Sequence, residues 1–358
     1  MYVSGGKKKE KEKAIKPNAF YLGIAAALLF IFSFLISMSI GSVGASFSET
    51  LRILVDYVIN PAISRDAQDS MAVILVNVRM PRVILSAMVG AALSIAGSAL
   101  QGLLKNPLAD GSTLGITSGG ALGAVLSLVW GIKVPGFLQL GTAVTSILFS
   151  FISILFIMAL SYKIDKVLSS QTIILTGVIF SMFAGSLTSF LVAVSGESLK
   201  QVVFWSMGSF SGRGWPHVRL MLPFFIAGSI VLMCLTWELN AFSLGEEQAR
   251  YIGVNTKKTK LIILIVVSVL VGISVAVSGT IGFVGLVVPH ITRLLTGPDY
   301  KKLLPLSMFF GASFLMLTDL LSRTVLSPAE LPIGVVTSFI GAVLFIYIFY
   351  NQSGRNTR

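Results

Sequence analysis

Long apolar runs separated by short polar stretches dominate the chain. A helix needs about 20 apolar residues to cross the hydrocarbon core of a bilayer, and most of these runs have that length. The pattern predicts an all-α polytopic membrane protein with about ten transmembrane helices. The clear runs cover 19–40, 83–104, 138–160, 172–194, 217–237, 260–278, 303–321 and 331–350, and weaker runs cover 113–130 and 281–297.

The two weaker runs are expected to make unusually close or irregular contacts with the rest of the protein. In the first, Gly115, Gly119 and Gly123 recur at every fourth position, a spacing that lets another helix approach closely. The second contains Pro289 and Arg293, which predict a short, bent or broken helix shielded from lipid.

A polar island, residues 243–255, separates two apolar runs. Glu246, Glu247 and Arg250 fall within about one helical turn, and Gly253 follows as a typical helix stop. These residues predict a short amphipathic helix on the membrane surface. Because the chain has no nucleotide-binding motif, such a helix is a candidate docking site for a partner.

Composition supports the membrane assignment and narrows the function. The charged fraction is 12% and the mean hydropathy is +0.88, whereas a soluble domain carries roughly twice that charge. The net charge is +12, but the basic residues lie at the ends of apolar runs and form no basic face, which argues against nucleic-acid binding. A single cysteine, Cys234, excludes an intrachain disulfide.

The basic residues also predict an orientation. With ten spans and a cytoplasmic start, both termini are cytoplasmic, and 18 of the 27 Lys and Arg residues lie on that side, as the positive-inside rule expects. Eight spans, without both weak runs, remain possible. We expect 1–18 to be a disordered cytoplasmic N-terminus, 19–350 to be one membrane domain with a cytoplasmic coupling segment at 240–258, and 351–358 to be a cytoplasmic tail.

Catalytic chemistry is not indicated. Only Asp319 lies inside an apolar run, and it is expected to pair with Arg323 one turn later. His217 and His290 stand apart from any Cys/His/Asp cluster, so no metal site is predicted, and no Walker A, G-x-S-x-G or H-E-x-x-H pattern occurs. This argues against an enzyme and weakens an ion-driven transport mechanism.

Three arginines at the other end of the spans are candidate contacts. Arg79 and Arg82 precede the second span and Arg323 follows the ninth. They are either interfacial arginines held by lipid headgroups or exposed cations that receive carboxylates of an external partner. On the inner side, the turn 101–111 connects two helices.

Several motifs in order resemble the FecCD/BtuC-like permeases of type II ABC importers, which carry iron–siderophores, haem or cobalamin. The matching segments are Val78–Arg82, Gly90–Gly102, Lys105–Asp110, Leu114–Ile116, Leu244–Arg250, Gly253–Asn255, Gly279–His290, Asp319–Arg323 and Glu330–Thr337. The resemblance implies ten helices in two inverted five-helix halves. A weak echo between 114–126 and 333–344 agrees with an internal repeat.

The resemblance also implies partners and roles for particular residues. The partners are a related permease in a homodimer or heterodimer, two cytoplasmic ATPase subunits that bind ATP and Mg, and an extracytoplasmic substrate-binding lipoprotein; this chain binds no cofactor. Arg79, Arg82 and Arg323 would receive glutamates of the binding protein. The ATPase-coupling residues would be Leu244, Gly245, Glu246, Glu247, Ala249, Arg250 and Gly253, and the cytoplasmic gate would be Asn106, Pro107, Leu108, Ser169, Ser170 and Gln171.

Transport is expected to proceed by alternating access, through a wide and weakly binding path lined by small hydroxylated side chains such as Ser94, Ser98 and Thr117. Ferric siderophores are the expected cargo because they are the commoner substrates of the family. Cobalamin or haem import, an ion-coupled secondary transporter and a membrane scaffold without a transport role remain alternatives.

Overall fold

The computed structural model describes residues 19–41, 44, 46–59, 70–132 and 141–356, with backbone only for 19, 197, 349 and 351–356. The described residues are helical or irregular. The helices are α1 Ala19–Ser39, α2 Phe47–Ile59, α3 Ser70–Ile74, the π-helical turn η2 Leu75–Arg79, α4 Met80–Leu103, α5 Ile116–Trp130, α6 Gly141–Ile164, α7 Ser170–Ala193, the 3-10 turn η3 Gly196–Ser198, α8 Leu199–Ser206, α9 Trp215–Cys234, α10 Thr236–Leu244, α11 Glu246–Tyr251, α12 Thr256–Ser278, α13 Val284–Thr296, α14 Tyr300–Thr324 and α15 Ile333–Asn356.

Each of the ten predicted spans corresponds to a helix. Seven described helices are long and apolar enough to cross a membrane, and three shorter apolar helices, α5, α13 and residues 333–348 of α15, account for the rest. The second span is longer than predicted, because it runs without interruption over 70–103. The π-helical turn η2 directly precedes Met80-Pro81, and it carries the helix past a proline that has no N–H to donate.

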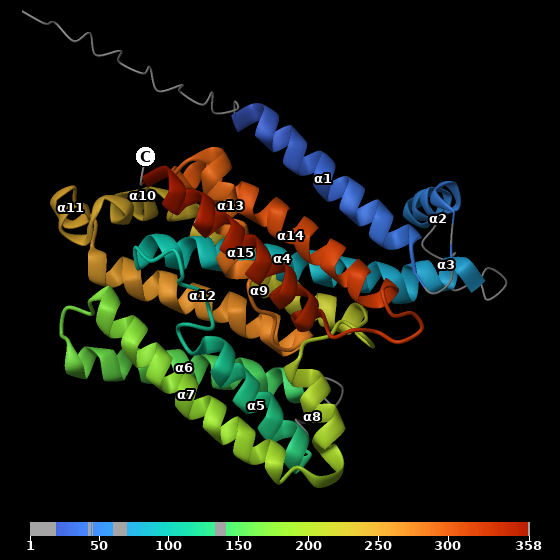
Figure 1. Cartoon of the computed structure of the whole chain (residues 1–358), viewed down its shortest axis with the longest axis horizontal. Helices are drawn as coiled ribbons and strands as arrows, with labels where there is room; N and C mark the ends of the chain where they lie inside the picture. The colour runs from blue at the N-terminus through green and yellow to red at the C-terminus, as the bar shows by residue number, and fades with distance from the viewer. Residues whose placement is uncertain (1–18, 42–43, 45, 60–69, 133–140, 357–358) are drawn as a thin grey trace, which may run out of the picture.

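The helices form a bundle around α4 (Figure 1). Helix α4 packs against α9, α12, α13 and α14, whereas α1 lies on the outside against α14. Glycines allow these close contacts: an added Cβ would lie 2.2 Å from Gly311 O at Gly90 and 1.8 Å from Gly285 O at Gly97. Small residues at crossing points are the usual way for membrane helices to approach closely.

The predictions for the two weak runs are confirmed. Helix α5 lies against α6, where an added Cβ at Gly119 would lie 2.4 Å from Ser153 Oγ and one at Gly123 would lie 2.6 Å from Thr145 O. Helix α13 is only 13 residues long and packs against α4, α14 and α15. Its broken start lies between protein and a cavity, the two settings in which irregular backbone is tolerated at membrane depth.

The two five-helix halves show a shared backbone feature in their third spans. Helices α5 and α13 are both preceded by a residue in the left-handed region, Gly115 with φ 73° and Phe283 with φ 68°. The echo between 114–126 and 333–344 instead relates the third span to the tenth, α15. One of these spans is the third of its half and the other is the fifth of its half, so the echo does not correspond to the repeat of the two halves.

The two ends of the bundle differ. Helix α1 begins and α15 ends on the side that carries α10 and α11, and α2 and α3 lie at the opposite end (Figure 1). The expectation for 1–18 lies outside the described residues. Helix α15 continues to Asn356, six residues past the end of the apolar run at 350.

Candidate functional site

Helices α10 and α11 form a surface segment at one end of the bundle (Figure 1). Gly245, with φ 139° and ψ 154°, ends α10 and precedes α11. A φ of 139° is a backbone conformation that side chains other than glycine rarely adopt, so glycine suits the sharp change of direction here. The short helix predicted from the polar island exists, as α11.

The outer face of this segment is both apolar and charged. Leu244 is 65% exposed and Tyr251 is 87% exposed, and Glu247 and Arg250 are also exposed. Within the part of the chain that the structure describes, neither Glu247 nor Arg250 forms an ion pair. Large exposed apolar side chains beside free charges are typical of a protein-binding surface.

The inner face of α11 is fixed to the bundle. Ala249 is fully buried, and its carbonyl accepts a hydrogen bond from Val254 N at 2.9 Å. Glu246 Oε2 receives a hydrogen bond from Lys260 Nζ in α12 at 2.7 Å. Of the predicted coupling residues, Gly245, Glu246 and Ala249 thus face the bundle, and Leu244, Glu247 and Arg250 face outward together with Gly253.

The three candidate docking arginines are brought together at the opposite end. Arg82 donates to Asp319 through Nε and Nη2 at 2.9 to 3.2 Å, and its Nη1 donates to Glu330 at 2.9 Å. Arg79 Nη1 donates to the carbonyl oxygens of Met38 and Ser39, at the end of α1.

Arg323 completes this group. Its Nη2 donates to the carbonyl oxygen of Ser37, and its Nε lies 3.7 Å from Asp319 Oδ2, so the predicted Asp319–Arg323 pair is confirmed. Arg79 is 5% exposed and Arg323 is 9% exposed.

The expectation that these arginines are exposed cations is therefore wrong. Burial of a guanidinium group requires compensating acceptors, and backbone carbonyls of α1 and two carboxylates provide them. The Arg82 side chain retains 11% exposure and Glu330 retains 37%. Arg82 and Glu330 are thus the members of the group that an external protein reaches most directly.

The predicted gate residues lie in two loops. Asn106 Oδ1 accepts a hydrogen bond from Leu108 N at 2.9 Å in the turn after α4, and Pro107 lines a small hollow beside Lys105 and Arg293.

In the second loop, Ser169 caps α7 by accepting a hydrogen bond from Thr172 N, and Ser170 and Gln171 begin the helix. Hydrogen bonds from the Ser169 side chain and backbone, among others, lower the pKa of Asp165 to about 2. This loop is therefore strongly held by its own polar groups.

A cavity of about 530 Å³ lies between the loop before α5, the end of α8, the broken start of α13 and the start of α15. Its lining combines five side chains that carry a hydroxyl group with three apolar side chains and two glycines, and it includes no ionisable side chain. The lining residues are Ser112, Thr117, Ser206, Met207, Thr280, Ile281, Gly282, Gly334, Val335 and Ser338.

Only one of the three predicted path residues lines this cavity, Thr117. Ser94 and Ser98 are fully buried in α4, and Ser98 Oγ donates to Ser307 Oγ of α14 at 3.0 Å. The prediction that Ser94 and Ser98 line the path is wrong because these small side chains permit close packing of α4 against α14.

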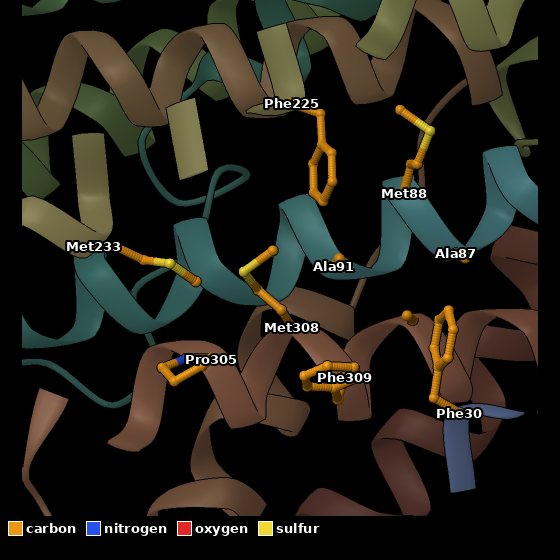
Figure 2. A pocket seen from close by; sticks show the side chains of 10 residues that line it. Phe30, Ala87, Met88, Ala91, Phe225, Met233, Pro305, Met308 and Phe309 are labelled. Carbon is orange, nitrogen blue, oxygen red and sulfur yellow. The ribbon is translucent and has the colours of Figure 1, made fainter. Parts of the chain in front are cut away.

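A second hollow, of about 350 Å³, has a different character. It lies between α1, α4, α9 and α14 and is lined only by apolar side chains, such as Phe225, Met233 and Met308 (Figure 2). It offers no polar group to orient a charged or polar cargo. The hydroxyl-lined cavity is thus the better candidate for a transport path.

The pattern that defines the FecCD transport family matches residues 29–351. The chain belongs to this family. It is 51% identical over 282 residues, 78% of this chain and 79% of that protein, to the uncharacterized ABC transporter permease protein YvrB of Bacillus subtilis. It is 38% identical over 283 residues, 79% of this chain and 75% of that protein, to the cobalamin import system permease protein BtuC of Halobacterium salinarum.

The fold is shared with a solved transporter. A structure assigned to the metal-chelate type of ABC transporter, in an inward-facing conformation, superposes with a TM-score of 0.81 at 32% identity and covers 93% of this chain and 100% of its own. Other relatives are named for hemin, molybdate and Fe(3+)-citrate. The family is thus established and the cargo varies within it.

Two residues of these sites were not assigned a role from the sequence. Glu330 is one of several loop acids, and Lys260 is one of three lysines that begin an apolar run. Only Lys260 is buried, at 1% exposure, whereas Lys257 and Lys258 are exposed. Burial in the folded structure distinguishes Lys260 from the other two lysines, whereas nothing in the neighbouring sequence does.

Proposed function

We propose that this chain is the membrane-spanning subunit of a binding-protein-dependent ABC importer. The observation that carries the proposal is the outward face of α10 and α11, where Leu244, Glu247, Arg250 and Tyr251 are exposed on a chain without a nucleotide-binding motif. A protein of this family needs an energy source from outside the chain, and this face is the surface for an ATPase subunit.

The assembly is a dimer of permeases, identical or related, with two cytoplasmic ATPase subunits that bind ATP and Mg. Closure of the ATPase pair displaces α10 and α11, and the helices transmit that movement to the path, which opens alternately to either side. Affinity for the cargo resides in an extracytoplasmic binding lipoprotein. It docks at the end that carries Arg82 and Glu330, with Arg79 and Arg323 beneath them.

This arrangement sets the topology. The end with α10 and α11 is cytoplasmic, and so are both termini, including the N-terminal segment 1–18 and the tail after 350. The gate loops at Asn106–Leu108 and Ser169–Gln171 then close the path on the cytoplasmic side.

The proposed cargo is a ferric siderophore. Its support is the hydroxyl-lined cavity, in which Thr117 and Thr280 offer weak, neutral contacts suited to a bulky chelate whose metal charge is already satisfied by its ligands. A strongly binding site would retain the cargo. Cobalamin or haem import is the second candidate, because relatives named for cobalamin and hemin share the family.

Reconstituted transport tests the proposal. The permease is placed in proteoliposomes with its cognate ATPase and binding protein, and uptake of ferric hydroxamates, ferric catecholates, ferric citrate, haem and cobalamin is measured. We expect ATP-dependent uptake of a ferric siderophore, and no uptake with an ATPase variant that lacks its catalytic glutamate. Uptake that persists with the inactive ATPase contradicts the proposal of an ATP-driven importer. Uptake of only cobalamin or only haem would show that this compound, and not a ferric siderophore, is the cargo.

A further inference from the structure

The ammonium group of Lys260 connects the surface helix α11 to the loop between α6 and α7. Lys260 lies in α12 and is 1% exposed. Its Nζ donates to Glu246 Oε2 of α11 at 2.7 Å and to the carbonyl oxygen of Leu168 at 2.8 Å. One buried charge therefore joins the consecutive helices α11 and α12 to a loop 92 residues earlier in the sequence.

The loop on the far side of this connection is rigid. Asp165 Oδ1 accepts a hydrogen bond from Val167 N at 2.9 Å, and Asp165 Oδ2 accepts one from Ser169 N at 2.8 Å. Leu168 adopts a left-handed conformation, with φ 57°, which turns the chain sharply before α7. A displacement of the Leu168 carbonyl therefore moves Ser169 and the first turn of α7 with it.

The other loop at this end also meets the start of α11. A Cβ added at Gly245 would lie 3.4 Å from Lys105 Nζ, and Lys105 directly precedes Asn106. Lys105 is exposed, however, and forms no hydrogen bond with α11 among the described residues. The buried link through Lys260 is the stronger of the two.

Burial makes this link stiff. A buried ammonium group cannot exchange a lost partner for water, so separating it from Glu246 carries a large desolvation penalty. If α11 shifts, the lower-energy response is for Lys260 and Leu168 to follow. The movement is then transmitted through the pair instead of being absorbed by it.

We propose that Lys260 is the positioning residue that transmits displacement of α11 to the start of α7, so that Ser169–Gln171 follows the ATPase-binding surface. This inference rests on the proposed function, because it requires an ATPase that moves α11. It adds to that function a defined route from the surface helix to one of the two cytoplasmic loops.

Distance measurements in the full complex test the route. The permease with Cys234→Ser is assembled with its ATPase in lipid nanodiscs and spin-labelled either at Ser243→Cys, on α10, or at Gln171→Cys, on α7. Each label is paired with Lys302→Cys on α14. Distances are compared without nucleotide and after trapping with ATP and vanadate.

In the otherwise unchanged permease, we expect both label pairs to shift on trapping. With Lys260→Met the shift at Ser243 persists and the shift at Gln171 is lost, and uptake per ATP hydrolysed falls by on the order of ten-fold, within the range of coupling between distant sites. Lys260→Arg should keep both the shift at Gln171 and the uptake per ATP hydrolysed, because a guanidinium can donate to the same two acceptors. Lys163→Met, which removes an exposed lysine at the end of α6, is the matched control and changes neither.

The outcomes separate the two proposals. Absence of any shift at Ser243 in the unsubstituted complex contradicts the proposed function. If the Lys260→Met complex shows the shift at Ser243 and the same shift at Gln171 as the complex with Lys260, the inference about Lys260 is overturned and the proposed function is not. If the Lys260→Met permease does not assemble with its ATPase, the variant Glu246→Gln is used instead. It weakens the same link to Lys260 while keeping a neutral acceptor. An undiminished shift at Gln171 in this variant would again overturn the inference about Lys260.

Discussion

Replacing Arg82 with glutamine tests whether the charge group opposite α11 holds the bundle together. Arg82 donates to Asp319 at 2.9 to 3.2 Å, and the Asp319 side chain is 1% exposed. No other described side chain donates a hydrogen bond to that carboxylate, and Arg323 Nε lies 3.7 Å away. Arg82→Gln therefore leaves a buried carboxylate with a single, more distant cation.

The expected cost follows from burial. Removing one partner of a buried ion pair costs about 3–5 kcal/mol of unfolding free energy, and the remaining Arg323 reduces this to roughly 2–4 kcal/mol. Glu330→Gln should cost less than about 1 kcal/mol, because that side chain is 37% exposed and an amide oxygen still accepts from Arg82. Arg52→Gln breaks an exposed i,i+4 pair with Asp56 and should cost about 0.5 kcal/mol or less.

Reversible unfolding in mixed micelles, titrated with SDS and followed by tryptophan fluorescence, measures these differences. We expect the order Arg82→Gln, then Glu330→Gln, then Arg52→Gln. The double variant Arg82→Gln/Asp319→Asn should recover no stability, since it leaves the buried Arg323 without its carboxylate partner. If Arg82→Gln costs no more than Arg52→Gln, the network does not stabilise the fold and the reasoning fails.

Four further predictions address the sites separately. Glu247→Lys should abolish ATP-dependent uptake while the permease still elutes as a folded protein, because it reverses a charge on the outward face of α11; normal uptake would remove the coupling assignment. Glu330→Gln removes a negative charge beside Arg82 and should raise binding-protein affinity at low salt by up to about five-fold, equivalent to ~1 kcal/mol; unchanged or weaker docking in thermophoresis would contradict this. Gly97→Ala should destabilise the bundle by about 1–3 kcal/mol through overpacking, whereas Gly185→Ala, with no atom within 4 Å of its added Cβ, should be neutral or stabilising in the same SDS titration. Asp165, whose pKa is lowered to about 2 from 3.8, should contribute stability above pH 3.8 that is lost as the pH falls toward 2, and Asp165→Asn should remove that pH dependence of thermal stability.

Much of the fold follows from local sequence. Each apolar run of span length became a helix, because in lipid a segment can satisfy its backbone groups only within itself or against protein. Gly119 and Gly123 correctly predicted a close helix contact, since their spacing alone places both on one face. The second span begins earlier than its apolar run predicted: the helix starts 13 residues before 83, at Ser70, and continues past Pro81 by way of a π-helical turn.

The sites were less predictable because side-chain partners are distant in the chain. Arg82 and Asp319 are 237 residues apart, and nothing beside Arg82 in the sequence shows that a carboxylate will bury it. Ser94 and Ser98 have the composition expected of a path, but α14 covers them. Thr117 carries the same kind of hydroxyl group as these two serines, but it lies at the start of α5 and lines a cavity.

Local sequence was enough to predict a membrane protein with ten spans, a charged surface helix and no recognisable catalytic motif. Hydropathy and charge patterns extend over one or two helical turns, so each can be read from a single stretch of sequence. Which charges are buried and which stay exposed depends on packing between distant parts of the chain. Lys257, Lys258 and Lys260 are chemically equivalent in the sequence. Packing of α12 encloses one of them between Glu246 and Leu168, and desolvation makes that lysine a rigid connection.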